Sequence, residues 1–94
     1  MNRPPLPPNS DREMFWMRDG VAYMHGGQFE VRVDELTGDE RYFASCIARC
    51  MWLDEAEHWA KTPVNDCKHF DDIAHWKSEA VANAEQWRKW GASG

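Results

Sequence analysis

The chain has 94 residues, which is enough for one small domain and too few for two. Apolar residues make up 43% of it and charged residues 29%, a composition typical of a globular protein and not of a disordered or collagen-like one. The formal net charge of −5 argues against direct binding of nucleic acid, because the phosphate backbone attracts clustered Lys and Arg. No stretch of the sequence approaches the ~18 consecutive apolar residues of a membrane-spanning helix.

Cysteine usage indicates the compartment. The chain has three cysteines, an odd number, and no charged-then-apolar secretory profile near its first residues. Both observations favour a reducing environment, so we expect a cytoplasmic protein.

Proline is concentrated at the beginning of the sequence, where Arg3 precedes four of the five prolines. Proline has no amide donor and fixes φ, so this stretch cannot join a strand ladder or a helix interior. We predict a flexible Pro-rich tail over residues 1–12 and a single α+β domain over residues 13–94. As an alternative, the proline cluster is a ligand for an aromatic-lined groove.

A β-type pattern follows, with apolar runs at residues 14–17, 21–24 and 29–33. Asp19-Gly20 and Gly26-Gly27 separate these runs and tolerate positive φ, so both predict tight hairpin turns. Phe29, Val31 and Val33 alternate with polar residues, which predicts a sheet with one face covered and the other wet.

Two helices complete the predicted fold. Thr37 and Glu40 match a capping box, which predicts a helix over residues 38–61. A second helix is predicted from Phe70 to Trp90, ended by Gly91, and the short loop between the helices makes them antiparallel. The fold class is therefore α+β, a three-stranded antiparallel β-meander followed by two long antiparallel α-helices.

The helices differ in their apolar faces. The second has a single predicted core stripe, formed by Phe70, Ile73, Ala80, Val81, Ala84 and Trp87. The first has two faces to bury, one formed by Phe43, Cys46, Ile47 and Cys50, and one on nearly the opposite side formed by Trp52 and Trp59.

Six tryptophans exceed what a core of this size normally needs. Aromatic side chains dominate protein-binding hot spots, so four of them form a candidate partner surface: Trp52, Trp59, Trp76 and Trp90. The alternative is that the sheet covers one face of the first helix and the second helix covers the other.

The acidic excess is local. Residues 34–57 contain Arg41 and Arg49 as their only basic residues and hold the acids Asp34, Glu35, Asp39, Glu40, Asp54, Glu55 and Glu57. One interpretation is a solvated helix face. The other is an acidic patch that binds a basic partner protein or imitates nucleic-acid phosphates.

Zinc-type ligands occur at Cys46, Cys50, Cys67 and His69. The first two share one face of the first helix, but the other two follow Lys61, some 15 Å or more along a helix at about 1.5 Å per residue. We therefore expect buried apolar thiols and no metal site.

Two carboxylate–histidine pairs, Glu55 with His58 and Asp72 with His75, have the spacing of di-iron bundles, but their histidines fall on charged faces. The cysteines lack the electropositive setting of a nucleophile, and Gly26-Gly27 is too short to cradle a phosphate. We therefore expect no cofactor and no enzymatic activity.

The remaining expectation is a small acidic protein-binding module that acts as an inhibitor or adaptor. Chains of this type look like accessory proteins of phages and mobile elements, including anti-CRISPR and other host-takeover inhibitors, an analogy that involves no matched motif. The alternatives are a Cys/His metal-binding protein and a homo-oligomeric structural protein, such as a homodimer.

Overall fold

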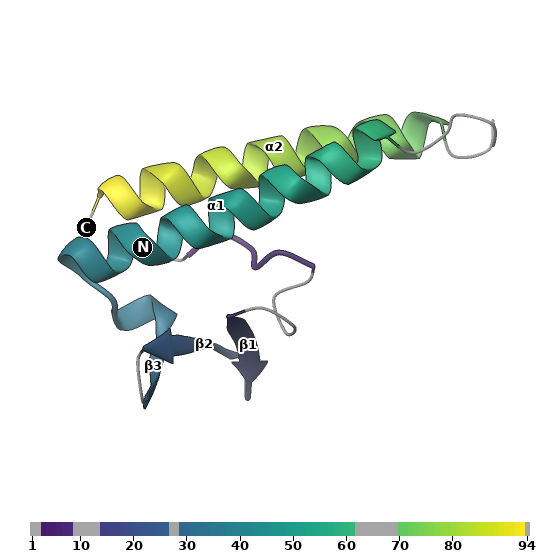
Figure 1. Cartoon of the computed structure of the whole chain (residues 1–94). Helices are drawn as coiled ribbons and strands as arrows, with labels where there is room; N and C mark the ends of the chain where they lie inside the picture. Colours follow the sequence, from purple (N-terminus) through teal and green to yellow (C-terminus); the bar gives the residue numbers. More distant parts are fainter. Residues whose placement is uncertain (1–2, 9–13, 27–28, 62–69, 94) are drawn as a thin grey trace.

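The computed structural model describes residues 3–8, 14–26, 29–61 and 70–93. These residues form a three-stranded antiparallel sheet in the order β1-β2-β3, followed by a 3-10 turn and two helices that lie side by side above it (Figure 1). The predicted fold class is confirmed. The elements are β1 (Phe15–Arg18), β2 (Val21–Gly26), β3 (Phe29–Arg32), η2 (Val33–Glu35), α1 (Gly38–Lys61) and α2 (Phe70–Ala92).

The first hairpin forms as its sequence predicts. Arg18 pairs with Val21, and the two residues between them, Asp19 and Gly20, have φ of 54° and 78°. Positive φ at both positions is the requirement of a type I′ turn, whose twist matches that of the flanking strands. In the second hairpin Gly26 pairs with Phe29, and the rest of the predicted Gly26-Gly27 turn lies outside the described residues.

One face of the sheet is covered, as predicted. Phe15, Ala22 and Met24 are buried beneath the helices. Phe29 departs from the prediction, because 75% of its side chain is exposed.

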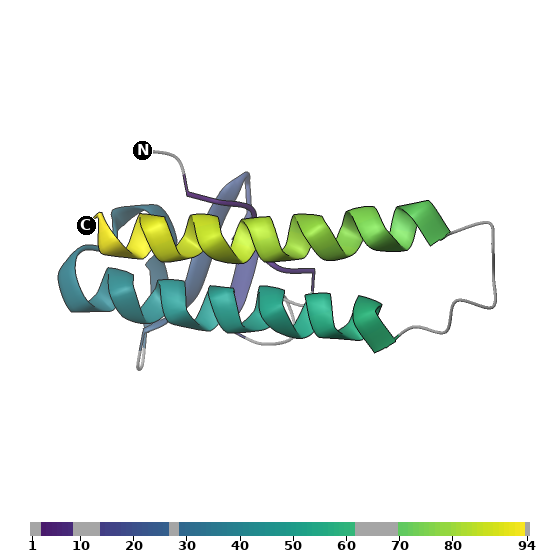
Figure 2. The same cartoon turned by 90° about the horizontal axis from the view of Figure 1, so that it is seen from above.

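The helices run antiparallel over nearly their whole length (Figure 2). The predicted bounds of α1 are confirmed, whereas α2 continues through Gly91, which was predicted to end it. A Cβ atom at position 91 would lie 2.5 Å from the Cβ of Ser45 and closer still to its Oγ. Gly91 therefore allows close contact between the helices instead of terminating α2.

The buried faces of the helices combine small residues with three tryptophans. The buried positions of α1 are Ala44, Ser45, Ala48, Trp52 and Ala56, and those of α2 include Ala80, Asn83, Ala84, Trp87 and Trp90. The apolar face predicted for the first helix is wrong for Phe43, which is 59% exposed, and for Cys50, which is also exposed, whereas Ile47 packs against the core. Val81 of the predicted α2 stripe is likewise exposed. Rows of alanine let two helix backbones approach closely, and this contact decides which face is buried.

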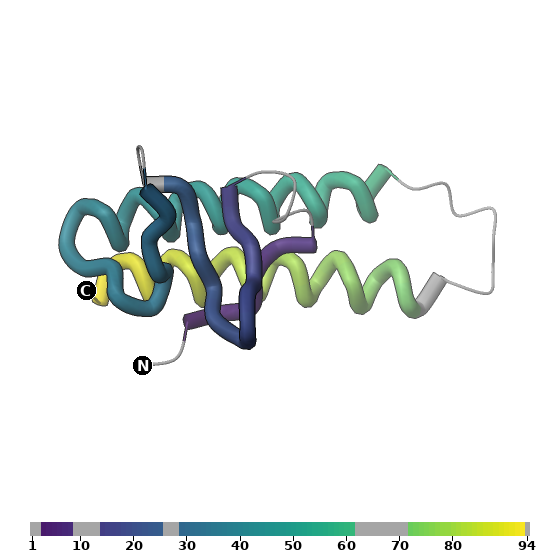
Figure 3. The backbone as a smooth tube through the Cα atoms, turned by 90° about the horizontal axis from the view of Figure 1, so that it is seen from below, coloured from purple at the N-terminus to yellow at the C-terminus, as the bar shows by residue number. Residues whose placement is uncertain are grey.

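The Pro-rich segment is part of the fold. Residues 3–8 run along the underside of the helix pair beside the sheet (Figure 3). Pro4 and Pro7 of this segment are buried. The Pro5 carbonyl accepts two hydrogen bonds, from Trp52 Nε1 at 2.9 Å and from Trp87 Nε1 at 2.8 Å. The predicted flexible tail is therefore wrong for residues 3–8, and its other positions lie outside the described residues.

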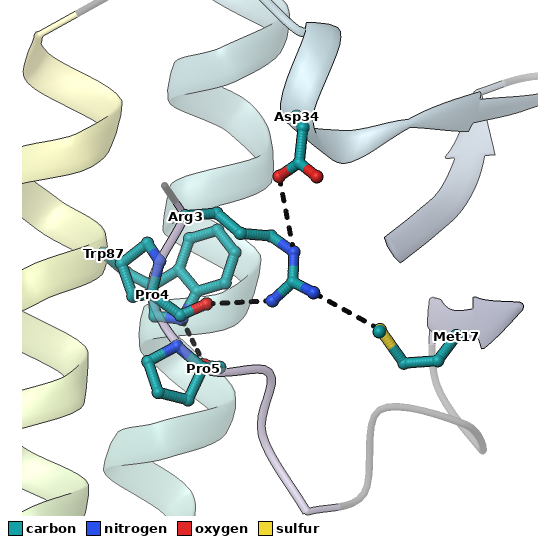
Figure 4. Close-up of polar contacts among 6 residues, drawn as sticks. All are labelled: Arg3, Pro4, Pro5, Met17, Asp34 and Trp87. Carbon is teal, nitrogen blue, oxygen red and sulfur yellow. Dashed lines mark hydrogen bonds and ion pairs between the residues drawn. The ribbon is translucent and has the colours of Figure 1, made fainter. Parts of the chain in front are cut away.

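The chemistry of proline explains why this segment can be buried. A buried amide N–H needs a hydrogen-bond acceptor. Proline has no amide N–H, so a buried proline leaves no unpaired backbone donor. The Pro5 carbonyl has two lone pairs, and two buried indoles each need one acceptor. Arg3 adds further contacts, with Nε 3.4 Å from the Asp34 carboxylate and Nη atoms donating to the Pro4 carbonyl and the Met17 sulfur (Figure 4).

Candidate protein-binding surface

The four tryptophans proposed as a partner surface do not form one exposed surface. Trp52 and Trp90 are only 8% and 2% exposed, so both belong to the core and their assignment to a partner surface is wrong. The Arg41 guanidinium covers the Trp90 ring at 4.1 Å and donates through Nε to the Trp90 carbonyl at 2.7 Å. Trp59 and Trp76 pack against each other near the other end of the helix pair, with ring centroids 4.7 Å apart.

A groove opens between the sheet and the beginning of α1. It is a cavity of 360 Å³, which we call the sheet–helix groove. Its apolar lining comes from both layers, and carboxylates of the first turn of α1 stand beside it. The lining residues are Met24, His25, Val31, Leu36, Asp39, Glu40 and Phe43.

A second hollow of 400 Å³ adjoins the sheet–helix groove and shares Val31, Leu36 and Glu40 with it. Its other carboxylates are already paired within the sheet layer. Arg18 donates to Glu30, and this hydrogen bond raises the pKa of the Arg18 guanidinium. The negative charge that is left for a partner is therefore on the α1 side of the groove.

Exposed apolar side chains continue from the groove along the outside of α1. Phe43, Cys46, Cys50 and Leu53 follow each other at spacings of three and four residues, which places them in one stripe of a helix. Phe43 and Leu53 are among the exposed large apolar residues of the protein, Cys50 is exposed and Cys46 is half-buried. We call these four residues the α1 stripe. The expectation of buried thiols is therefore wrong for Cys50.

Three acids of the predicted acidic patch form ion pairs with basic residues. Asp34 pairs with Arg3 at 3.4 Å, Glu35 with Arg32 at 3.3 Å and Glu57 with Lys61 at 2.8 Å. The hydrogen bond from Lys61 also lowers the pKa of the Glu57 carboxyl.

The other acids of the patch are placed differently. Within the described residues Asp39, Glu40 and Asp54 are exposed and have no ion-pair partner. Glu55 is half-buried and lies in a separate pocket with Trp59 and Trp76. The uncompensated carboxylates thus accompany the groove and the α1 stripe.

Two other kinds of site are absent from the described residues. They contain no group of three His, Cys, Asp or Glu side chains that could hold a metal ion, while Cys67 and His69 lie outside them. In the same part of the chain, neither helix combines the length and apolarity needed to cross a membrane.

Comparison of the chain with protein-family models, with curated proteins and with solved structures gave no match.

Sequence reasoning missed part of this surface and misplaced another part. The α1 stripe contains three residues of the face that was predicted to be internal, namely Phe43, Cys46 and Cys50. The signal that could have shown this is the run of alanines on the opposite side of the helix. The proline cluster was predicted to be a flexible tail, with a ligand for an aromatic-lined groove as the alternative, whereas the Pro5 carbonyl binds two tryptophans of its own chain.

Proposed function

We propose that this protein is a non-catalytic protein-binding module, an inhibitor or adaptor that acts in the cytoplasm. The observation that supports the proposal is an apolar groove that continues into the exposed α1 stripe and is accompanied by uncompensated carboxylates. Exposed apolar surface with a polar rim is typical of protein interaction sites.

The partner that best fits this surface is an amphipathic helix with basic residues beside its apolar face. Its apolar side chains would lie on Phe43 and Leu53, and its Lys and Arg would face Asp39, Glu40 and Asp54. A second copy fits less well, because an antiparallel pairing of two α1 stripes centred on Ala48 would place Asp39 opposite Glu57 of the other copy.

Small size, acidity and a protein-binding surface are also what an accessory protein of a phage or mobile element needs to inhibit a host protein. We include an inhibitor of this type, comparable to anti-CRISPR and other host-takeover proteins, in the proposal.

The test is affinity capture from the native host, followed by binding measurements with the purified partner. We expect Phe43→Ser and Asp54→Lys each to weaken binding about tenfold or more, because truncating a central hot-spot residue costs about 2 kcal/mol. Matched controls on α2, Val81→Ser and Glu85→Lys, change an exposed apolar residue and an exposed acid elsewhere and should leave affinity unchanged.

Three results would contradict the proposal. The first is a partner whose affinity is the same for Phe43→Ser, Asp54→Lys and the wild type. The second is a partner that binds through an acidic surface. The third is a stable dimer in solution that Phe43→Ser dissociates, which would show that a second copy covers the α1 stripe.

A further inference from the structure

A separate pocket lies between the two helices, away from the sheet–helix groove. It has a volume of 280 Å³ and is lined by Pro8, Trp52, Glu55, Trp59, Trp76 and Glu79. We call it the tryptophan pocket. Pockets for drug-sized ligands span about 300–1,000 Å³, so this one suits a smaller group.

The aromatic walls of the pocket are held in place. Trp59 and Trp76 come from different helices and pack with ring centroids 4.7 Å apart at an interplanar angle of 43°. Trp52 is fixed by the hydrogen bond from its Nε1 to the Pro5 carbonyl. His58 contacts the Trp59 ring edge-on at a centroid distance of 5.0 Å. Trp76 keeps 37% of its surface exposed, so the pocket is accessible from solvent.

Two carboxylates accompany these rings, one from each helix. Glu55 is half-buried and has no ion-pair partner within the described residues. Glu79 lies 3.6 Å from His75 Nε2, an ion pair only when the histidine is protonated. Among the residues that the structure describes, the pocket lining contains no Lys or Arg. The pocket is therefore aromatic and negatively charged when His75 is neutral.

We propose that the tryptophan pocket binds an alkylated ammonium group. A cation over the faces of Trp rings is attracted by the ring quadrupole, and this attraction grows when the cation is desolvated. The alkyl substituents provide apolar surface for the rings, while the carboxylates of Glu55 and Glu79 balance the charge. A bare metal ion would find oxygen ligands on only two sides, and a neutral apolar ligand would leave both carboxylates uncompensated.

The test is a titration of the ¹⁵N-labelled protein with choline, followed through the indole N–H resonances at about pH 8, where an ordinary histidine is neutral. We expect saturable shifts of the Trp59 and Trp76 indoles and little change at Trp87 and Trp90. The neutral isostere 3,3-dimethylbutan-1-ol, which has the same shape and no charge, should bind at least about tenfold more weakly, because the cation–π attraction and both carboxylate interactions are absent.

Variants separate the aromatic and electrostatic contributions. Trp76→Leu should weaken choline binding about twofold to thirtyfold, and Glu79→Gln about twofold to fivefold. Glu85→Gln removes an exposed acid of the same helix outside the pocket and should leave the affinity unchanged. Glu79→Gln preserves shape and keeps the test valid if Trp76→Leu fails to fold.

Peptides with trimethylated and unmodified lysine distinguish the two sources of the group. Tighter binding of the trimethylated peptide than of choline indicates a methylated protein side chain, and the reverse indicates a small metabolite; both results support the proposal. Equal binding of the isostere and choline, tighter binding of free arginine, or the absence of saturable shifts would overturn it. These ligands and variants do not involve the α1 stripe, so this proposal and the proposed function can fail separately.

Discussion

Replacing Gly91 with alanine tests how closely the two helices approach. The new Cβ would lie 2.5 Å from the Cβ of Ser45, whereas ordinary contacts of this kind begin near 3.4 Å. A Cβ atom is attached to the backbone and cannot rotate away. The helices must therefore separate by about 1 Å at this point, near the end of α2 where Trp87 and Trp90 are buried.

The magnitude follows from two opposing effects. Alanine is a better helix former than glycine by about 1 kcal/mol, which on its own would stabilise the variant. Overpacking a close contact costs about 1–3 kcal/mol, and the position next to the Ser45 backbone favours the upper end of that range. We therefore expect Gly91→Ala to lower the free energy of unfolding by about 2 kcal/mol, equivalent to a decrease in Tm of about 8–16 °C.

The assay is urea unfolding followed by tryptophan fluorescence. Ala82→Gly, at an exposed position of α2, should lose about 0.5–1 kcal/mol and measures helix propensity without the close contact. Ser45→Gly removes the atoms that the new methyl group would meet, so the double variant should be more stable than the sum of its single changes predicts. If Gly91→Ala were as stable as the wild type, or if the double variant showed no such coupling, the steric argument would be refuted.

Three further predictions concern stability. Deleting residues 1–8 should lower the free energy of unfolding by at least about 2 kcal/mol in urea, because two buried indole N–H groups lose their acceptor; deletion of the first two residues alone is the control. Arg41→Met should cost about 1–2 kcal/mol by the same assay, since the guanidinium covers the Trp90 ring and bonds the last turn of α2, and an unchanged Tm would contradict this role. Hydrogen bonds from Lys61 and Arg88 lower the pKa values of Glu57 and Glu85, so these pairs stabilise the fold above the ordinary carboxyl pKa and lose that effect as the pH falls through the lowered values. The wild type should therefore exceed the double Gln variant in stability at about pH 7 but not at about pH 2, and a difference that persists in acid would refute this assignment.

The elements of this fold could be predicted because their signals are local. Asp19-Gly20 is a turn by its own conformational preference, and α1 begins and ends at its predicted residues. The buried face of α1 could not be found in the same way. Alanines such as Ala44 and Ala48 contribute little apolar area, so the larger side chains of Phe43 and Cys50 indicated the wrong face. Contact with α2 decides which face of α1 is buried, and this contact joins residues that are far apart in the sequence.

The candidate sites show the same limit. The local acidic excess predicted a charged patch. Only the structure shows that Arg3 pairs with Asp34, while Asp39 and Asp54 have no ion-pair partner among the described residues. An excess of tryptophan suggested a binding surface. In the structure Trp87 and Trp90 are buried in the core, whereas Trp59 and Trp76 line a pocket together with the buried Trp52.

The double hydrogen bond to the Pro5 carbonyl also has a consequence for how the chain acquires its structure. Trp52 follows Pro5 by 47 residues and Trp87 follows it by 82. The Pro5 carbonyl is therefore synthesised well before the two indole N–H groups that it binds. Until α2 has left the ribosome, the Pro5 carbonyl cannot accept the hydrogen bond from Trp87, and the proline segment can pack only against the sheet and α1. The sheet and α1 can form earlier, whereas we expect closure of the core over the proline segment to come late in synthesis and, because of the long sequence separation, to be slower than formation of the hairpins.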